Sequence, residues 1–163
     1  MDKDVAVVFD CGSTNLTVIA IDASGEILTS WSSPNEPVSP EDEPDDHLVW
    51  DIDALWKKLS TLCSHCTEEI DTERIAAVTV TTWGTDGTFI DEDGEFLYPP
   101  ISWQDGRTGP LAEQVKKDLD PWEIYRTSGY TVIPFNAILR LRWFADNEPE
   151  MVENARHFLM MPG

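Results

Sequence analysis

The sequence is poor in positive charge. Its 11 lysines and arginines stand against 31 aspartates and glutamates, which gives a formal net charge of −20 at neutral pH. A field of this sign repels nucleic acid and anionic membrane surfaces, and we therefore exclude both as partners. It also opposes the binding of a nucleotide, so that any nucleotide site must rely on a metal ion and on backbone amides. Because salt screens self-repulsion, the acidic composition further suggests the hypothesis of a salt-rich habitat.

Long apolar segments and secretion signals are absent as well. No stretch approaches the roughly 20 apolar residues needed to cross a bilayer. The first four residues, Met1 to Asp4, lack the basic segment of a signal peptide. We therefore expect a cytoplasmic protein. Hydrophobic residues make up 41% of the 163 residues, which suffices for the core of one domain.

Cysteine is scarce, and its spacing gives little support to a metal site. There are three cysteines, and an odd number without a secretion signal indicates a reducing compartment. Cys63 and Cys66 share a helical face, whereas His65 between them points elsewhere. A single pair of this kind is weak evidence for zinc. We interpret both as structural thiols on a helix.

The hydrophobic pattern of the first half predicts a mixed α/β fold. Strands are expected at 5–9, 16–21 and 27–33, and their short connections predict an antiparallel three-strand meander. Apolar residues spaced three or four apart over 55–70 predict a helix, capped by Asp51 or Asp53. A strand over 75–82 follows, and this order favours parallel pairing with the earlier sheet.

The second half predicts a hairpin and then mainly helices. Residues 88–90 and 96–98 flank the turn-forming sequence Glu92-Asp93-Gly94. Further apolar patterns predict helices at 111–119, from Pro121, around 137–144 and from Pro149, and a strand near 157–161.

The segment 34–46 differs from the rest in composition. It holds four prolines, and five acidic residues lie between Glu41 and Asp46. Such a composition is typical of a solvated loop, and we expect it to make no anchoring contact with a core.

The turn between the first two strands carries the first candidate site. Glycine at position 12 permits a close backbone approach. The amides and hydroxyls that surround it can cradle phosphate oxygens. Asp10, at the end of a strand, can hold a magnesium ion through water. The alternative is an ordinary polar hairpin turn. The residues concerned are Asp10, Gly12, Ser13, Thr14 and Asn15.

The segment 81–87, at the end of the 75–82 strand, is the second candidate. Its polar and aromatic side chains, with two glycines, resemble the wall of a small-ligand pocket. Trp83 offers an apolar face and Thr85 a hydroxyl, while Asp86 can accept hydrogen bonds from sugar hydroxyls. The alternative is that Asp86 caps its own turn through Gly87.

The segment 101–107 is the third candidate. Trp103 offers a flat face for a sugar. Gln104, Asp105 and Arg107 supply the directional donors and acceptors that a polyol requires. The alternative is that Arg107 pairs with Asp105 at the start of a helix.

Together these segments resemble the FGGY family of carbohydrate kinases, from one end of the chain to the other. The resemblance is carried by FDCGSTN, TTWGTDG, LYPPISWQDGRT and SGYTVIPFNAILRLRW. It implies a ribonuclease-H-like lobe of the actin-like ATPase fold. It also implies that residues 1–163 are an incomplete N-terminal kinase domain, the first lobe, with the second lobe outside this chain.

The resemblance also assigns roles to residues. The first turn becomes the phosphate-binding loop for ATP and Mg²⁺, and Asp86, Trp103 and Arg107 fall in the sugar-binding region. Phe135 and Asn136, after Pro134, lie where relatives present side chains to the sugar. The general base is expected downstream of this chain, so that the fragment alone would be inactive. Relatives usually carry an arginine seven residues after the aspartate of the first turn, where this sequence has Thr17.

The function implied by this resemblance is ATP-dependent phosphorylation of a ketose of the L-fuculose, L-rhamnulose or xylulose type. The partners would be the sugar and ATP, and the complete protein is a candidate homodimer. Two alternatives stay open at this point. The first is another actin-like ATPase, such as a chaperone or cell-shape protein, and the second is a non-catalytic sugar-binding or regulatory module.

Overall fold

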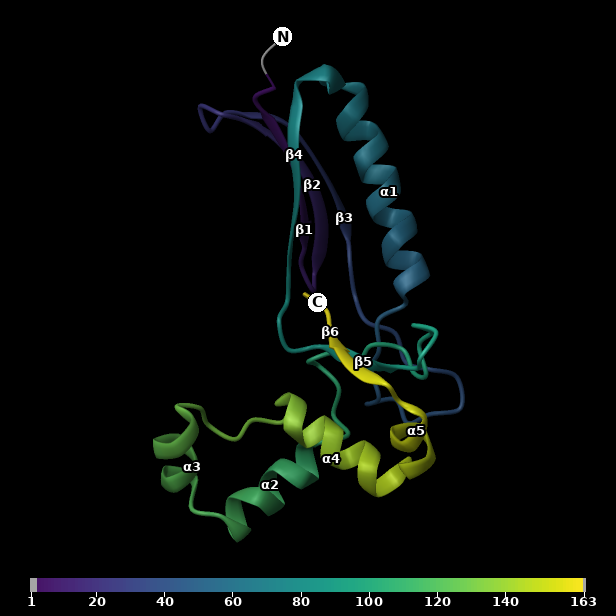
Figure 1. The fold of residues 1–163 in the computed structure, drawn as a ribbon, viewed down its shortest axis with the longest axis vertical. Coiled ribbons are helices and arrows are strands. Elements are labelled where there is room, and N and C mark those ends of the chain that lie inside the picture. The colour runs from purple at the N-terminus through teal and green to yellow at the C-terminus, as the bar shows by residue number, and fades with distance from the viewer. Residues whose placement is uncertain (1–2, 163) are drawn as a thin grey trace. The chain divides into compact units, whose positions relative to one another are not determined.

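The structure is a computed structural model that describes residues 3–162 (Figure 1). It divides the chain into two compact units. Residues 3–37, 51–84 and Pro162 belong to the first unit, and residues 38–50 and 85–161 to the second. The chain therefore passes from one unit to the other more than once.

The first unit is built on a mixed sheet of four strands in the order β3-β2-β1-β4. β1 pairs antiparallel with β2, and β2 pairs antiparallel with β3. β1 also pairs with β4, in this case in parallel. The strands span Val5–Cys11 (β1), Asn15–Asp22 (β2), Ile27–Pro34 (β3) and Ile75–Thr82 (β4).

Helix α1 (Ile52–Glu68) covers one face of this sheet and packs on β2 and β3 (Figure 1). Asp51 caps it, since its carboxylate accepts a hydrogen bond from the amide of Ala54 at 2.9 Å. The apolar side of α1 is buried with alternate residues of β1 and β2, and Cys66 is fully enclosed there. A 3-10 turn, η1 (Thr72–Arg74), leads into β4. The buried apolar residues of this unit include Val5, Val7, Leu16, Val18, Ala20, Leu55 and Leu62.

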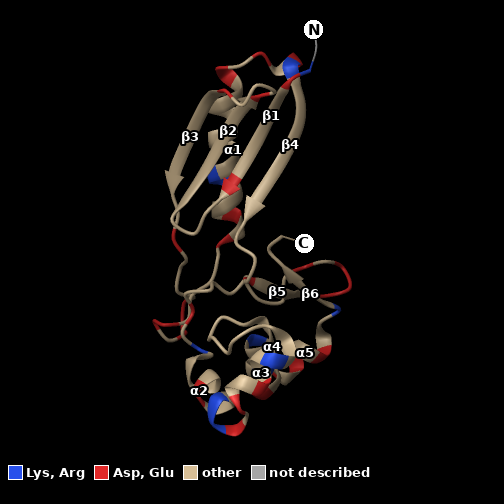
Figure 2. Ribbon diagram, turned by 90° about the vertical axis from the view of Figure 1, so that its left-hand side faces the viewer, with Lys and Arg blue, Asp and Glu red and all other residues tan. Residues whose placement is uncertain are grey.

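β4 lies at an edge of the sheet and is exposed over residues 76–81. It carries no charged side chain, as Figure 2 shows. Val78 and Val80 are 63% and 62% exposed. The strands that bury alternate residues are therefore β1 and β2, and the turn between them is built on this packed pair.

The second unit combines a two-stranded antiparallel sheet with four helices. β5 (Gly87–Ile90) pairs with β6 (His157–Met160). Phe89, Ile101 and Phe144 form one buried cluster, and Ala112, Val132 and Leu139 form another. Within residues 3–162, no helix combines the length and the apolar character that crossing a membrane requires. The helices are α2 (Gly109–Asp118), α3 (Pro121–Ser128), α4 (Ala137–Asn147) and α5 (Pro149–Asn154).

The hairpin predicted between residues 88–90 and 96–98 forms only in part, because residues 96–98 are bridged to β5 but make no regular strand. A turn does follow β5, but Phe96 makes only an isolated bridge with Ile90. The ladder partner of β5 is β6, far along the sequence. Leu97 and Tyr98 instead pack against the buried cluster of this unit. The local pattern indicated the turn correctly but contained no information on the distant strand that pairs with the other edge of β5.

The prediction that the loop at 34–46 lacks anchoring contacts is wrong. In the first unit, Asn35 is only 6% exposed and is hydrogen-bonded to the carbonyl of Gly12. In the second unit, Glu43 accepts a hydrogen bond from the hydroxyl of Tyr98 at 2.7 Å. These two anchors are hydrogen bonds of polar side chains, and Val38 adds a backbone bridge to Val49, so that the acidic and proline-rich composition alone did not indicate them.

Candidate functional site

The turn between β1 and β2 is closed by one backbone hydrogen bond. The amide of Gly12 donates to the carbonyl of Asn15 at 2.9 Å. A Cβ atom at position 12 would lie 2.7 Å from that same carbonyl oxygen, closer than real contacts allow. The tight turn therefore requires glycine here, as the sequence predicts.

Asn35 holds the turn from the segment that follows β3. Its side-chain amide donates to the carbonyl of Gly12 at 3.0 Å, and its backbone amide donates to the carbonyl of Thr14 at 2.8 Å. Both bonds hold carbonyl groups of the turn, and neither uses the amide of Ser13 or Thr14. Sequence reasoning missed Asn35, because a lone asparagine in a proline-rich segment gives no signal of its own.

The turn keeps free donors in the part of the chain that the structure describes. The amides of Ser13 and Thr14 donate to no protein group there, and neither do the two hydroxyls of these residues. Ser13 is partly exposed and Thr14 is exposed. Successive free amides beside hydroxyls are the donors that a phosphate group binds, so this arrangement can receive an anion.

Asp10 lies at the end of β1, beside the turn, and its side chain is exposed. Residues 3–162 contain no group of three or more histidine, cysteine, aspartate or glutamate side chains arranged to hold a metal. Mg²⁺ commonly binds through one or two carboxylates, several waters and substrate phosphates. The single carboxylate of Asp10 next to free amides therefore fits Mg²⁺ that arrives with a nucleotide, and it does not fit a protein-enclosed metal.

Asp86 occupies the centre of a buried polar network in the second unit, and its side chain is fully buried. The indole of Trp50 donates to it at 2.6 Å, the hydroxyl of Thr85 at 3.0 Å, and the backbone amide of Trp103 also donates to it. Arg140, from α4, lies 3.5 Å from the carboxylate. The carboxylate of Asp86 is therefore enclosed by four protein groups.

The charges of Asp86 and Arg140 are balanced against burial. Loss of solvent raises the pKa of the Asp86 carboxyl, although Trp50, Arg140 and Thr85 act in the opposite direction. Burial likewise lowers the pKa of Arg140, while the negative charge of Asp86 opposes that shift. Each member of the pair thus depends on the other to carry a charge in a dry site.

Asp105 and Arg107 form a second buried pair, and their side chains are 2% and 1% exposed. The guanidinium Nε donates to the carboxylate at 2.9 Å, and the amide of Leu48 donates to the other carboxylate oxygen at 2.7 Å. The alternative left open by the sequence, that Arg107 pairs with Asp105, is therefore what the structure shows. The Arg107 Nη1 atom is buried without a hydrogen-bond partner among the described residues.

The rest of the Arg107 guanidinium is held by Tyr98 and Glu43. Its Nη2 donates to the Tyr98 hydroxyl at 3.0 Å, and that hydroxyl donates to Glu43 at 2.7 Å. Burial raises the pKa of Tyr98 to about 12. Burial opposes the charge of Arg107, but Asp105 and Tyr98 raise its pKa above the ordinary value. The rings of Tyr98, Trp143 and Phe144 surround the guanidinium at 5.2, 5.0 and 5.7 Å, which favours the cation.

Two aromatic residues of the predicted sugar site come together as an aromatic corner, by which we mean Trp103 and Phe135. Their rings lie 6.0 Å apart between centroids at 83°. Trp103 is 40% exposed, and Gln104 beside it is exposed. Asn136 accepts a hydrogen bond from the amide of Ile133 at 2.9 Å and precedes α4. The corner therefore offers an accessible flat surface next to the exposed amide side chain of Gln104.

The predicted site residues fall into two groups. Trp83 belongs to the first unit, as do all the residues of the phosphate turn. The second unit brings together Thr85, Asp86, Trp103, Gln104, Asp105, Arg107, Phe135 and Asn136. Sequence reasoning missed the residues that support the second group, namely Trp50, Tyr98, Glu43 and Arg140. The only available signal was Arg140, a charged residue among the apolar positions of a predicted helix.

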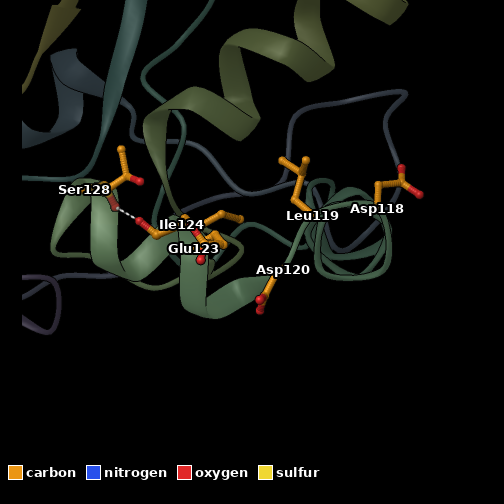
Figure 3. A pocket seen from close by; sticks show the side chains of 7 residues that line it. Asp118, Leu119, Asp120, Glu123, Ile124 and Ser128 are labelled. Carbon is orange, nitrogen blue, oxygen red and sulfur yellow. Dashed lines mark hydrogen bonds between the residues drawn. The ribbon is translucent and has the colours of Figure 1, made fainter.

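Two hollows in the second unit are lined almost entirely by residues outside the predicted site, Asn136 being shared. One, of about 550 Å³, is lined by the end of α2 and by α3, with Ser128 hydrogen-bonded to the carbonyl of Ile124 (Figure 3). The other, of about 560 Å³, is lined mainly by apolar side chains of α2 to α4 and includes Asn136. Three acidic residues line the first hollow, which makes it unsuited to a phosphate.

Comparison with known proteins supports one family over nearly the whole chain. The family model described as "FGGY family of carbohydrate kinases, N-terminal domain" matches residues 5–162. L-fuculokinase of Haemophilus influenzae is 34% identical over 162 residues, covering 96% of this chain and 34% of that protein. L-fuculokinase of Salmonella typhi is 32% identical over 161 residues, covering 99% of this chain and 34% of that protein. The chain thus spans about a third of the length of these curated relatives.

Solved structures show the same fold. Xylulose kinase from Lactobacillus acidophilus aligns with a TM-score of 0.82 at 20% identity, over 94% of this chain and 31% of that one. Gluconate kinase from the same organism aligns with a TM-score of 0.81 at 20% identity, over 95% and 31%. At this identity the likeness shows the fold alone.

Proposed function

The chain belongs to the FGGY family of carbohydrate kinases, and on this basis we propose that it supplies the phosphate turn and part of the sugar pocket of an ATP-dependent ketose kinase. The observation that carries the proposal is the turn at residues 12–15. Its carbonyls are held by Asn35, while the amides of Ser13 and Thr14 have no protein partner among the described residues. A turn that only linked two strands would need neither feature.

The reaction transfers the γ-phosphoryl group of ATP to a ketose hydroxyl. A bond forms between the sugar oxygen and the γ-phosphorus, the bond to the bridging oxygen of ADP breaks, and the hydroxyl proton passes to a base. The amides and hydroxyls of Ser13 and Thr14 bind phosphate oxygens, and Asp10 holds Mg²⁺ through water. Mg²⁺ supplies charge neutralisation at the phosphates. We assign no residue of this chain as the base and expect it in the remainder of the protein, the second lobe included.

We assign two roles in the sugar site, contact with the sugar and support of the segments that make this contact. Trp103 and Phe135 of the aromatic corner, together with Gln104, are the residues that we assign to contact with the sugar, and Thr85 of the same unit adds to them. The carboxylates of Asp86 and Asp105 and the guanidinium of Arg107 are committed to protein partners. We therefore assign these three, and Asn136, to holding the segments that carry the exposed side chains. Direct contact of Asp86 or Arg107 with the sugar would require these bonds to rearrange.

A six-carbon deoxyketose is the substrate class we favour, with L-fuculose first. This choice is supported by the L-fuculokinases that match almost the full chain at 32% to 34% identity. L-Rhamnulose and xylulose are the competing ketoses. A hydroxyl orientation or a methyl group changes binding by only about 1–3 kcal/mol unless a polar group is stranded. The cytoplasmic location and the homodimer expected from the sequence stay predictions.

The test is an ATP-coupled assay of the complete protein with L-fuculose, L-rhamnulose and D-xylulose, each with and without Mg²⁺. Gly12→Ala forces a Cβ atom to 2.7 Å from the Asn15 carbonyl and should abolish turnover. Gly109→Ala is the matched control, because nothing lies within 4 Å of its Cβ position. Equal turnover of the two variants would contradict the phosphate role of the turn.

Calorimetry of the same protein separates the two rival functions. Binding of MgATP without any ketose binding would favour another actin-like ATPase. Binding of a ketose without MgATP binding would favour a sugar-binding or regulatory module. The kinase predicts that both ligands bind, and that Gly12→Ala impairs the binding of MgATP while it spares that of the ketose.

A further inference from the structure

We propose that Arg140 is a positioning residue of the sugar site, which ties the segment carrying Trp103 to the helix that begins beside Phe135. The proposal rests on the proposed function for the identity of the ligand, but its geometric basis is independent of that function. The guanidinium of Arg140 is hydrogen-bonded to Asp86 and to two backbone carbonyls, and to neither ring of the aromatic corner. It acts through the backbone that carries them.

Arg140 joins two segments that are distant in the sequence. Its Nη1 donates to the carbonyl of Thr85 at 2.6 Å, and its Nη2 donates to the carbonyl of Ser102 at 2.9 Å. Ser102 directly precedes Trp103, whose own amide donates to Asp86. The carbonyl and the amide of the peptide unit between Ser102 and Trp103 are thus both held by the same buried pair, Arg140 and Asp86.

Because Arg140 lies near the start of α4, its hydrogen bonds also fix the position of the residues that precede this helix. α4 begins at Ala137, directly after Phe135 and Asn136, and Arg140 lies in its first turn. A shift of α4 relative to Ser102 therefore changes the distance between Phe135 and Trp103. The guanidinium spans that gap with a rigid, planar group that has donors on two sides.

Thr108 makes a second tie between the same two segments. Its hydroxyl donates to the carbonyl of Pro134 at 2.6 Å, and its residue is 1% exposed. Pro134 directly precedes Phe135. The two segments that form the aromatic corner are therefore joined once before Phe135, through Thr108, and once after it, through Arg140. Two ties on either side of one aromatic ring define its placement, where one would leave a hinge.

The cost of burying Arg140 argues for this role. Its side chain is 1% exposed and that of Asp86 is 0% exposed, and their separation of 3.5 Å is long for a direct hydrogen bond. Buried ion pairs are seldom more stabilising than apolar residues of the same volume. The strong bonds of Arg140 go to two carbonyls, so its contribution is to fix the backbone geometry of two segments.

The experiment compares three variants of the complete protein. Arg140→Met removes both donors, Arg140→Lys keeps the charge but reaches one carbonyl at a time, and Arg142→Met is the control. Arg142 is two residues along the same helix, 64% exposed and paired with Asp146, so its loss changes the net charge equally. Steady-state kinetics would give the KM for the ketose and the KM for ATP separately. Hydrogen exchange would report the amides of residues 102–108.

We expect Arg140→Met to raise the KM for the ketose by about 10- to 100-fold, the loss typical of a misplaced binding group, with the KM for ATP within about twofold. Arg140→Lys should lie between this variant and the wild type. The amide of Trp103 should exchange faster in Arg140→Met and unchanged in Arg142→Met. A merely stabilising role would instead lower the active fraction, and thus kcat, with both KM values unchanged.

Two results would overturn the proposal: a ketose KM in Arg140→Met equal to that of Arg142→Met, or protection of the Trp103 amide that survives in Arg140→Met. Failure of the proposed function looks different, because the wild type itself would then phosphorylate no ketose. In that case the exchange measurement still decides whether Arg140 holds this segment. If Arg140→Met does not fold, the same comparison is made with Arg140→Lys, which must show the intermediate ketose KM and faster exchange.

Discussion

Thr17 lies directly opposite Asp10 in the ladder between β1 and β2. Residues opposed in this way point to the same face of a sheet, with Cβ atoms about 5 Å apart. The hydroxyl of Thr17 lies 3.2 Å from that of Ser32 on the next strand. The place where the family resemblance implies an arginine is thus next to the carboxylate assigned to Mg²⁺, and here it is neutral.

Thr17→Arg should therefore strengthen the binding of MgATP. A cation ~7 Å from a phosphate at an effective dielectric of ~40 contributes about 1 kcal/mol, so the KM for ATP should fall about fivefold. Thr17→Gln, which is of similar length but neutral, should leave it unchanged. The measurement is KM for ATP at low and high salt, since screening should shrink the effect. A higher KM would mean that the new arginine pairs with Asp10 and displaces the metal.

Trp103→Ala should weaken the binding of the ketose without affecting the binding of ATP. Trp103 is 40% exposed and forms the accessible wall of the aromatic corner with Phe135. Loss of one aromatic contact of about 1.5 kcal/mol corresponds to a rise in the KM for the ketose of about tenfold. Trp122→Ala removes a tryptophan that is 63% exposed on α3 and serves as the control. Equal effects of the two substitutions would remove Trp103 from the site.

The strands and helices were predictable where the pattern was local. The predicted strand at 75–82 is β4 to the residue, and of the two predicted cap candidates it is Asp51 that caps α1. The hairpin after β5 forms only a short bridge at one edge of the strand, and residues 157–160 pair with β5 at its other edge. Local propensity cannot indicate such a distant partner, since that pairing depends on tertiary packing.

The site was predictable in its positions but less so in its roles. Gly12 and Asp10 follow from the chemistry of a strand-end turn, and the turn has the expected form. For Asp86 and Arg107, the sequence showed polar groups near tryptophans but not their burial. The groups that occupy them, such as Trp50 and Tyr98, lie 36 and nine residues away and reach them only in the folded unit. Because both side chains are buried and hydrogen-bonded to protein groups, we propose that they support the site and do not contact the sugar.

Tyr98→Phe should destabilise the second unit. The substitution removes the acceptor for Nη2 of Arg107, whose Nη1 already lacks a hydrogen-bond partner among the described residues. A buried charged donor left unpaired costs about 1–3 kcal/mol, and the free energy of unfolding in urea should fall by that amount. Tyr130→Phe, at a residue that is 51% exposed, should change it by less than about 0.5 kcal/mol. A fall no larger than that of the control would show that the aromatic rings alone satisfy Arg107.

Glu43 should make the stability of the protein sensitive to acid. Burial by itself raises the pKa of the Glu43 carboxyl, but hydrogen bonds from Tyr98 and His47 and the charge of Arg107 outweigh it, and the net pKa lies below the ordinary value of 4.5. The folded state therefore prefers the ionised form. This contribution to stability is complete above about pH 4.5, the unfolded value, and is lost as the pH falls through the lower folded value.

Glu43→Gln removes this dependence, because glutamine cannot ionise. We expect the variant to be less stable than the wild type at pH 7, and the difference in urea midpoint to shrink as the pH is lowered from 5 to 3. Glu92→Gln, in the exposed turn after β5, should show no such trend. Urea unfolding of the wild type and both variants at pH 7, 5, 4 and 3 provides the measurement. A difference that stays constant over this range would mean that Glu43 acts through hydrogen bonding alone, since the stabilisation would then be independent of its charge.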